Sequence, residues 1–244
     1  MGVTASGTSG APFEVPNSTL ADTLMERLTV VYPAAADPGR AASMRAYMKD
    51  IAPFLGLSTP DRRALSRTVL LDTARPDERD CTALALRCWG LPEREYQYFA
   101  VDYLRRHVTR LSSEFLPVAR NLIATVSWWD TVDALAAHVV GGLVTADPGL
   151  RSEMDVWIED DDLWVARTAL LHQLRHKEAT DVERLFAYCA RRSGDTDFFI
   201  RKAIGWCLRE YAKTDPQAVR DFVAAERERL APLSVREALK NVGP

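Results

Sequence analysis

The sequence predicts an all-α protein built as a HEAT-like helical repeat solenoid. Apolar residues recur at spacings of three and four from about Thr19 to the end of the chain, as in Phe115/Val118/Leu122, and no strand-like alternation interrupts them. Helix pairs recur at intervals of roughly 30 to 40 residues, which is typical of helical repeats. A globular bundle, the alternative, is expected to have longer helices. The concave surface of a solenoid offers a groove for an extended partner such as duplex DNA or a peptide.

The chain divides into two predicted regions. Residues 1–18 are rich in Gly, Ser, Thr, Ala and Pro and contain neither a basic residue nor an apolar run, so we expect a disordered extension and no secretory signal. Residues 19–244 are expected to form one domain, and no stretch is apolar enough to span a bilayer. The four cysteines form no C-x-x-C pair and lie among apolar residues. We interpret them as reduced and buried, which predicts a cytoplasmic protein.

Capping residues mark where the helices are expected to begin. A capping side chain precedes a proline suited to the first helical turn at Thr59-Pro60, Asp147-Pro148 and Asp215-Pro216. Three further starts resemble capping boxes: Ser127-x-x-Asp130, Thr180-x-x-Glu183 and Ser234-x-x-Glu237. These signals predict many short helices joined by short loops.

The charge balance argues weakly against a general nucleic-acid binder, because the net charge is −3 and the pI is about 5.9. The distribution is uneven, however. Six basic residues against two acidic ones lie between Arg40 and Arg67, whereas residues 159–162 are a continuous acidic run. Separate basic and acidic faces are compatible with this pattern.

Two segments place tryptophans beside charged residues. Trp129 and Asp133 are four residues apart and share a helical face, while Trp206 follows Lys202 by four and precedes Glu210 by four. A buried core stripe would not carry these charges. An aromatic face and a carboxylate both attract positive charge, so the pattern indicates a site for a cationic substrate or transition state. The neighbouring Trp128 is expected to be structural, and Asp130 to stabilise the positive end of its helix.

Other catalytic patterns are weak or missing in the sequence. His172-x-x-x-His176 has the spacing of a zinc pair, but Gln173 occupies the place of the glutamate of a zincin and no third ligand is apparent. The sequence has no Gly-rich phosphate loop and no G-x-S-x-G elbow. We therefore expect neither a metal nor an organic cofactor.

Several separated segments resemble one known family. Residues 47–50, 53–63 (PFLGLSTPDRR), 89–97 (WGLPEREYQ), 127–133 and 198–214 are similar, in this order, to the AlkD family of HEAT-like alkylpurine DNA glycosylases. The resemblance implies a solenoid that holds duplex DNA in its concave groove and hydrolyses the N-glycosidic bond of alkylated purines, without flipping the base. It also implies that the catalytic aspartate is Asp133, that the paired tryptophans are Trp129 and Trp206, and that Arg167 contacts DNA.

The remaining DNA contacts are predicted within the matching segments, and they are Tyr47, Lys49, Arg62, Arg63, Arg201, Lys202 and Arg209. Asp50 departs from the family pattern, since relatives often carry an amide there, and its charge puts a nearby phosphate contact in doubt.

We expect Asp133 to stabilise an oxocarbenium-like deoxyribose and to orient water, with the two tryptophans against the sugar and backbone. The substrates expected are cationic N3- or N7-alkylated purines, and the family resemblance extends this to bulky minor-groove adducts and to self-resistance in antibiotic producers. General repair and self-resistance both fit the sequence. A monomer is expected. Two other classes stay open: a non-catalytic DNA-binding protein of this fold and a HEAT scaffold that binds protein.

Overall fold

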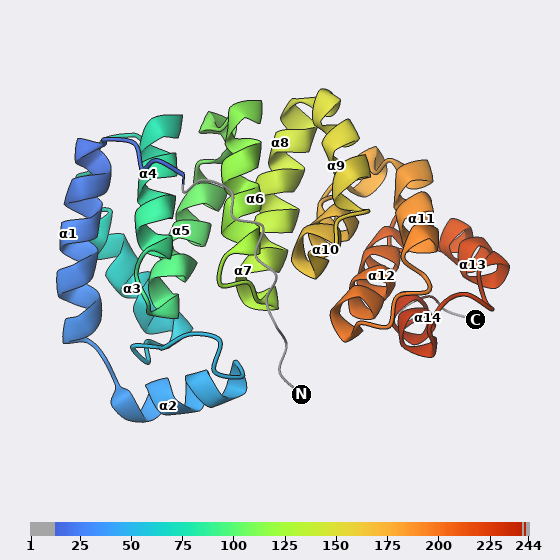
Figure 1. Cartoon of the computed structure of the whole chain (residues 1–244), viewed down its shortest axis with the longest axis horizontal. Coiled ribbons are helices and arrows are strands. Elements are labelled where there is room, and N and C mark those ends of the chain that lie inside the picture. Colours follow the sequence, from blue (N-terminus) through green and yellow to red (C-terminus); the bar gives the residue numbers. More distant parts are fainter. Residues whose placement is uncertain (1–12, 241, 243–244) are drawn as a thin grey trace.

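The computed structural model describes residues 13–240 and residue 242, and these residues form helices and connecting segments without a strand. The predicted all-α class is therefore confirmed. The α-helices follow one another along the long axis of the molecule, from α1 at one end to α13 and α14 at the other (Figure 1). Their bounds are α1 Thr19–Ala34, α2 Pro38–Tyr47, α3 Thr59–Val69, α4 Glu78–Trp89, α5 Arg94–Arg106, α6 Leu116–Ala124, α7 Trp129–Ala134, α8 Gly141–Ala146, α9 Arg151–Trp157, α10 Leu163–Leu171, α11 Val182–Arg191, α12 Phe198–Tyr211, α13 Pro216–Ala225 and α14 Pro232–Ala238.

The helices form two packed rows, as expected for a helical repeat solenoid. One row contains α1, α4 and α6, which contact one another in sequence order. The second row contains α5, α7, α10, α12 and α14, again each against the next. The core lies between the rows and is made of aliphatic and aromatic side chains such as Leu24, Leu84, Phe99 and Leu122. Because each helix of the second row packs against the next, the row forms a continuous surface along the molecule.

A π-helical turn interrupts the regular geometry of this second row. Leu135–Val140 forms the π-helix η3, which joins α7 to α8 without a break. Such turns insert one extra residue and often accompany functional sites. Just after it, Gly141 lies so close to α10 that an added Cβ would come within 2.2 Å of the His172 carbonyl oxygen. Only glycine allows this approach, which holds the α7–η3–α8 run against α10.

The helix starts agree with only part of the capping prediction. Asp215 caps α13 and Asp147 accepts a hydrogen bond in a short 3₁₀ turn, as predicted. The cap of α3 is Ser58, one residue before the predicted Thr59. The three predicted capping boxes are wrong, because α7, α11 and α14 are preceded by Trp128, Asp181 and Ala231. The hydroxyls of Ser127 and Ser234 instead donate to the carbonyls of Ile123 and Arg201.

The structure describes only part of the predicted N-terminal extension, residues 1–18. Residues 1–12 of the predicted extension lie outside the described residues. Ser18, its last residue, caps α1 and donates a hydrogen bond to Asp80, so it is part of the folded domain.

All four cysteines are free and buried, as expected. Among the described helices, none has the length and apolar character that a membrane crossing requires.

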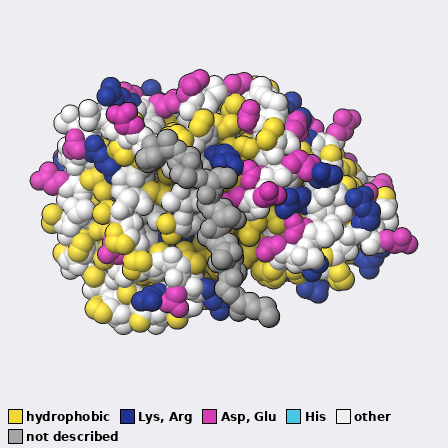
Figure 2. Space-filling view, viewed as in Figure 1, with side chains coloured by type: hydrophobic (Ala, Val, Ile, Leu, Met, Phe, Trp, Pro, Cys, Tyr) yellow, Lys and Arg dark blue, Asp and Glu magenta, His cyan; other side chains and the backbone are white. Residues whose placement is uncertain are grey.

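Positive and negative side chains are intermixed on the face of the molecule drawn in Figure 2, most clearly over its C-terminal half. The uneven charge distribution along the sequence therefore does not produce a large field of one sign on that face. Many of these charges form ion pairs, including Arg45 with Asp50 and Arg191 with Glu159.

Candidate active site

The two tryptophans and the aspartate singled out in the sequence lie together on the second row of helices. Trp129 and Asp133 come from α7 and Trp206 comes from α12. All three line two adjoining open cavities, one of about 390 Å³ on the side of η3 and one of about 380 Å³ on the side of α14. We call these two cavities together the central depression. The residues that the sequence placed seventy positions apart therefore share one surface hollow.

Asp133 is held in the central depression by Arg167 of α10. The guanidinium donates from Nε to Oδ1 at 2.7 Å and from Nη2 to Oδ2 at 2.8 Å, which is a bidentate ion pair. Only 15% of the Asp133 side chain and 5% of the Arg167 side chain are exposed. Burial raises the pKa of the Asp133 carboxyl, while the guanidinium opposes this by stabilising the charged form. The arginine thus keeps a carboxylate in a place that would otherwise favour the neutral acid.

Arg167 has a second anchor besides Asp133. Its Nη1 donates to the carbonyl oxygen of Phe199, at the start of α12, and its guanidinium lies 5.9 Å from the centre of the Phe199 ring. These contacts join α7, α10 and α12 through one side chain. The predicted DNA-contacting arginine is therefore committed to contacts inside the protein, and only 4% of the residue is exposed.

The start of α7 is fixed by a second buried ion pair that the sequence analysis missed. Arg94, which is fully buried, donates to Asp130 from Nε at 3.0 Å and from Nη2 at 2.5 Å. Tyr98 donates to the same carboxylate at 2.5 Å. Asp130 also lies in the first turn of α7 and accepts the backbone N–H of Thr131, in agreement with its predicted place at the helix end, so it has a tertiary role in addition to a local one.

Arg94 also secures the loop before α7. Its Nη1 donates to the carbonyl of Val126 at 2.7 Å. Val126 has a φ of +48°, a left-handed conformation that is costly for a β-branched residue. The hydrogen bond to a buried guanidinium is the compensating contact. A buried arginine requires an acidic partner, and this requirement is the sequence signal for the role. The partner Asp130, however, lies 36 residues away along the chain.

A cluster of aromatic side chains packs next to the cavity on the α14 side. Trp128 packs against Trp164 and Phe199, with ring centres 5.6 and 5.1 Å apart, in agreement with its predicted structural role. Phe198 is 57% exposed at the edge of the cavity on the α14 side. The depression therefore places the Asp133 carboxylate beside several aromatic faces.

The cations predicted on α12 are partly neutralised by α14. Glu237 pairs with Lys202 at 3.2 Å and with Arg209 at 2.6 Å, and all three line the cavity on that side. The close approach depends on Gly205, where an added Cβ would lie 2.5 Å from Cβ of Glu237. Arg201 donates to the carbonyl of Asp195 at 2.7 Å and lines neither cavity.

The cations predicted near the N-terminus do not line the central depression. Arg62 is buried and donates to Asp102 at 2.9 Å, so its guanidinium serves an internal ion pair. Arg63 and Lys49 are exposed, and Tyr47 is 73% exposed. Lys49 and Asp50 both have left-handed φ angles in the turn after α2, and Asp50 pairs with Arg45 at 2.6 Å.

The histidine pair has ordinary hydrogen-bonding roles. His172 is buried and bonds to the carbonyl of Ala169, while His176 bonds to Thr145 and to the carbonyl of Gly141. No cluster of three or more metal-ligating side chains occurs among the residues that the structure describes. His176 instead joins the segment after α10 to α8, whereas the bond of His172 stays at the end of α10.

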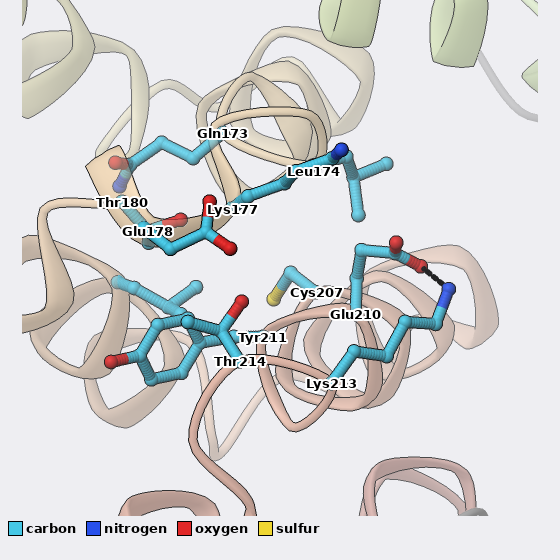
Figure 3. A pocket seen from close by; sticks show the side chains of 11 residues that line it. Gln173, Leu174, Lys177, Glu178, Thr180, Cys207, Glu210, Tyr211, Lys213 and Thr214 are labelled. Atoms are coloured by element: carbon cyan, nitrogen blue, oxygen red, sulfur yellow. Dashed lines mark hydrogen bonds and ion pairs between the residues drawn. The ribbon is translucent and has the colours of Figure 1, made fainter.

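A smaller cavity of about 160 Å³ lies behind the central depression, between the end of α10, the turn η5 (Lys177–Ala179) and α12 (Figure 3). Glu210 and Leu174 line both this cavity and the depression. Glu210 pairs with Lys213 at 2.6 Å. The thiol of Cys207 faces this cavity and lies 3.5 Å from the thiol of Cys189, whose pKa is raised by burial. These groups form a wall of the depression and bring no further acid or base to Asp133.

Comparison with known proteins identifies the family of this chain. The family model described as DNA alkylation repair enzyme matches residues 31–242. Among solved structures, a protein described as a predicted DNA alkylation repair enzyme from Enterococcus faecalis is 32% identical, with a TM-score of 0.78, over 85% of this chain and 97% of that one. No curated protein matches the chain. Because the family model spans most of the sequence, the chain belongs to the family of DNA alkylation repair enzymes.

Proposed function

We propose that this DNA alkylation repair enzyme is a glycosylase that hydrolyses the N-glycosidic bond of N3- or N7-alkylated purines in duplex DNA. The observation that carries the proposal is that Asp133, Trp129 and Trp206 together line an open depression on the second row of helices. A carboxylate and two aromatic faces stabilise positive charge. The reaction that develops such charge in damaged DNA is loss of an alkylated base from deoxyribose.

In the proposed reaction the bond between C1′ of the sugar and the base nitrogen breaks, and its electrons leave with the base. The alkylated base departs as a neutral molecule and the sugar becomes an oxocarbenium-like cation. Asp133 stabilises this cation and orients a water, whose oxygen bonds to C1′ and whose proton is released. Trp129 and Trp206 pack against the sugar and its backbone. The products are the free base and an abasic site.

Arg167 acts as a positioning residue in this proposal. Its bidentate pair with Asp133 and its bond to the Phe199 carbonyl hold the carboxylate in one orientation. The guanidinium also weakens the field of the carboxylate, since a positive charge lies directly behind it. The site is therefore suited to labile cationic lesions and not to intact purines.

The open form of the depression supports chemistry without base flipping. Its two cavities are shallow and continuous with the surface, so the sugar can be approached while the base stays in the duplex. Exposed Phe198 extends an apolar face beside the site, which suits bulky minor-groove adducts and hence self-resistance to a DNA-alkylating natural product. DNA contacts by Tyr47, Lys49, Arg63, Lys202 and Arg209, a monomeric state and a cytoplasmic location are proposed together with this function.

The direct test is incubation with duplexes that carry 7-methylguanine, 3-methyladenine or a bulky N3-adenine adduct, followed by chromatography of the released base and cleavage at abasic sites. We expect release of the free base and an equal yield of abasic sites. Binding without release would contradict the glycosylase proposal. It would favour the alternative of a non-catalytic DNA-binding protein, which is compatible with the pairing of both Asp133 oxygens to Arg167.

A further inference from the structure

We propose that Arg105 and Arg175 form a binding site for the phosphodiester backbone of DNA on the η3 side of the central depression. This inference rests on the proposed function, and it adds two residues that neither the sequence motifs nor the family resemblance identified. The ligand is a backbone phosphate of the strand that crosses the depression.

The two arginines lie at or just beyond the ends of two helices of the second row that both pack against η3. Arg105 lies in the last turn of α5, and Arg175 lies four residues after Leu171, the last residue of α10. His138 of η3 lines the same cavity as Arg175. Burial and then the charges of Arg105 and Arg175 lower the pKa of His138 to about 4.

This pair of arginines is continuous with the proposed catalytic site. Arg175 and His138 line the same cavity of about 390 Å³ as Trp129, Asp133 and Trp206. A DNA strand whose sugar lies over Asp133 therefore passes the Arg105/Arg175 pair with its neighbouring phosphates.

The charge balance of the lining distinguishes these two arginines. Each acidic side chain on this side of the depression already has its own cation: Asp102 pairs with Arg62, Asp130 with Arg94, Asp133 with Arg167 and Glu210 with Lys213. Arg105 and Arg175 are exposed and have no ion-pair or hydrogen-bond partner among the described residues. At neutral pH His138 is uncharged. The η3 side of the depression therefore has two positive charges in excess, and an anion is the missing partner.

The α14 side of the depression has a smaller excess of positive charge. There Lys202 and Arg209 share Glu237, so one of their two charges is already balanced. A polyanion that enters the depression meets free guanidiniums first on the η3 side. Arginine suits this role because its planar fork binds two phosphate oxygens at once.

The test compares Arg105→Gln, Arg175→Gln and the double variant with Arg79→Gln as a matched control. Arg79 is also exposed and has no ion-pair or hydrogen-bond partner for its side chain among the described residues, but it lies at the start of α4 in the other row. Binding to an undamaged duplex is measured by fluorescence anisotropy at several salt concentrations. Each lost phosphate contact should lower the slope of log K against log salt by about 0.9. We expect a decrease of about one for each single variant, about two for the double variant and none for the control.

Excision under saturating single-turnover conditions separates this inference from the proposed function. The parent and the Arg79→Gln control should release 7-methylguanine at similar rates once bound. Release by the parent with unchanged salt slopes in the double variant overturns the phosphate site and leaves the glycosylase proposal standing. If the salt slopes decrease in the variants as expected but the parent releases no base, the phosphate site is supported and the glycosylase proposal is contradicted.

A parent protein that binds no duplex overturns both proposals. Inorganic phosphate provides the last arm of the experiment, because the same guanidiniums could hold a free ion. If millimolar phosphate binds the parent but not the double variant, as measured by isothermal titration calorimetry, while the salt slope of duplex binding is the same in both proteins, the site is one for free phosphate and the assignment to the DNA backbone is wrong. We expect instead that the salt slope falls in the double variant, and that phosphate at constant ionic strength competes with the duplex on the parent only.

Discussion

Replacement of Asp133 by asparagine removes the charge on which the proposed chemistry depends while keeping the size of the side chain. A carboxylate about 4 Å from a cationic sugar stabilises it by about 4 kcal/mol at an effective dielectric near 20. The positive charge of Arg167, about 8 Å from the same sugar, repels the cation by about 2 kcal/mol. In the parent the net stabilisation is therefore about 2 kcal/mol, and in Asp133→Asn the repulsion is left unopposed. The difference of about 4 kcal/mol corresponds to a roughly thousandfold slower release of base.

The same variant also leaves the buried Arg167 without its partner, which is expected to cost about 3 to 5 kcal/mol of stability. The assay must therefore count folded protein, by circular dichroism and denaturant titration, before single-turnover release of 7-methylguanine is measured. Asp130→Asn is the matched control, because it removes a buried partner of Arg94 on the same helix. Similar loss of stability but a much smaller loss of rate is expected for it. Release by Asp133→Asn within about tenfold of the parent would refute the electrostatic reasoning.

Four further outcomes are expected. Arg167→Ala should move the acid limb of the excision pH profile to higher pH, because loss of the guanidinium raises the pKa of the carboxyl it holds, and a change only in the salt slope of binding would instead indicate a phosphate contact. Glu237→Gln should tighten duplex binding and steepen its salt dependence, because it frees Lys202 and Arg209; unchanged binding would show that these cations do not contact DNA. Burial lowers the pKa of His172 from 6.5 to about 4, so the unfolded chain takes up a proton in this window that the folded protein excludes. His172 should contribute about 3 kcal/mol to the fall in the free energy of unfolding as the pH drops from 6.5 to 4, so the fall measured by denaturant titration should be smaller by about this amount in His172→Gln. Excision should persist in EDTA, and its loss would point to a metal requirement.

The fold and the centre of the site were accessible from the sequence because they depend on local spacing. Apolar residues at three and four residue intervals determine which helix face is buried, and this correctly predicted the helical repeats. Trp129 and Asp133 lie one helical turn apart, so their common face follows from the sequence alone. Their convergence with Trp206 depended on the solenoid stacking α7, α10 and α12 in order, which the resemblance implied.

The partners of the charged residues were not accessible in the same way. Arg62 was predicted to contact DNA, yet it is buried against Asp102, forty residues away. Arg94 has the same type of role and received no prediction. Nothing in the local sequence distinguishes these arginines from the exposed Arg105. The difference arises from where each helix meets its neighbour, and ion pairs between repeats are set by that packing.

The measurement that tests the central claim most directly is the selectivity of base release by the parent protein. Duplexes with 3-methyladenine, which leaves from a cationic nucleoside, and with hypoxanthine, which is neutral, differ in the property that Asp133, Trp129 and Trp206 are proposed to recognise. We expect rapid release of 3-methyladenine and no detectable release of hypoxanthine under the same conditions. Equal release of both bases would contradict the claim that this site acts by stabilising positive charge.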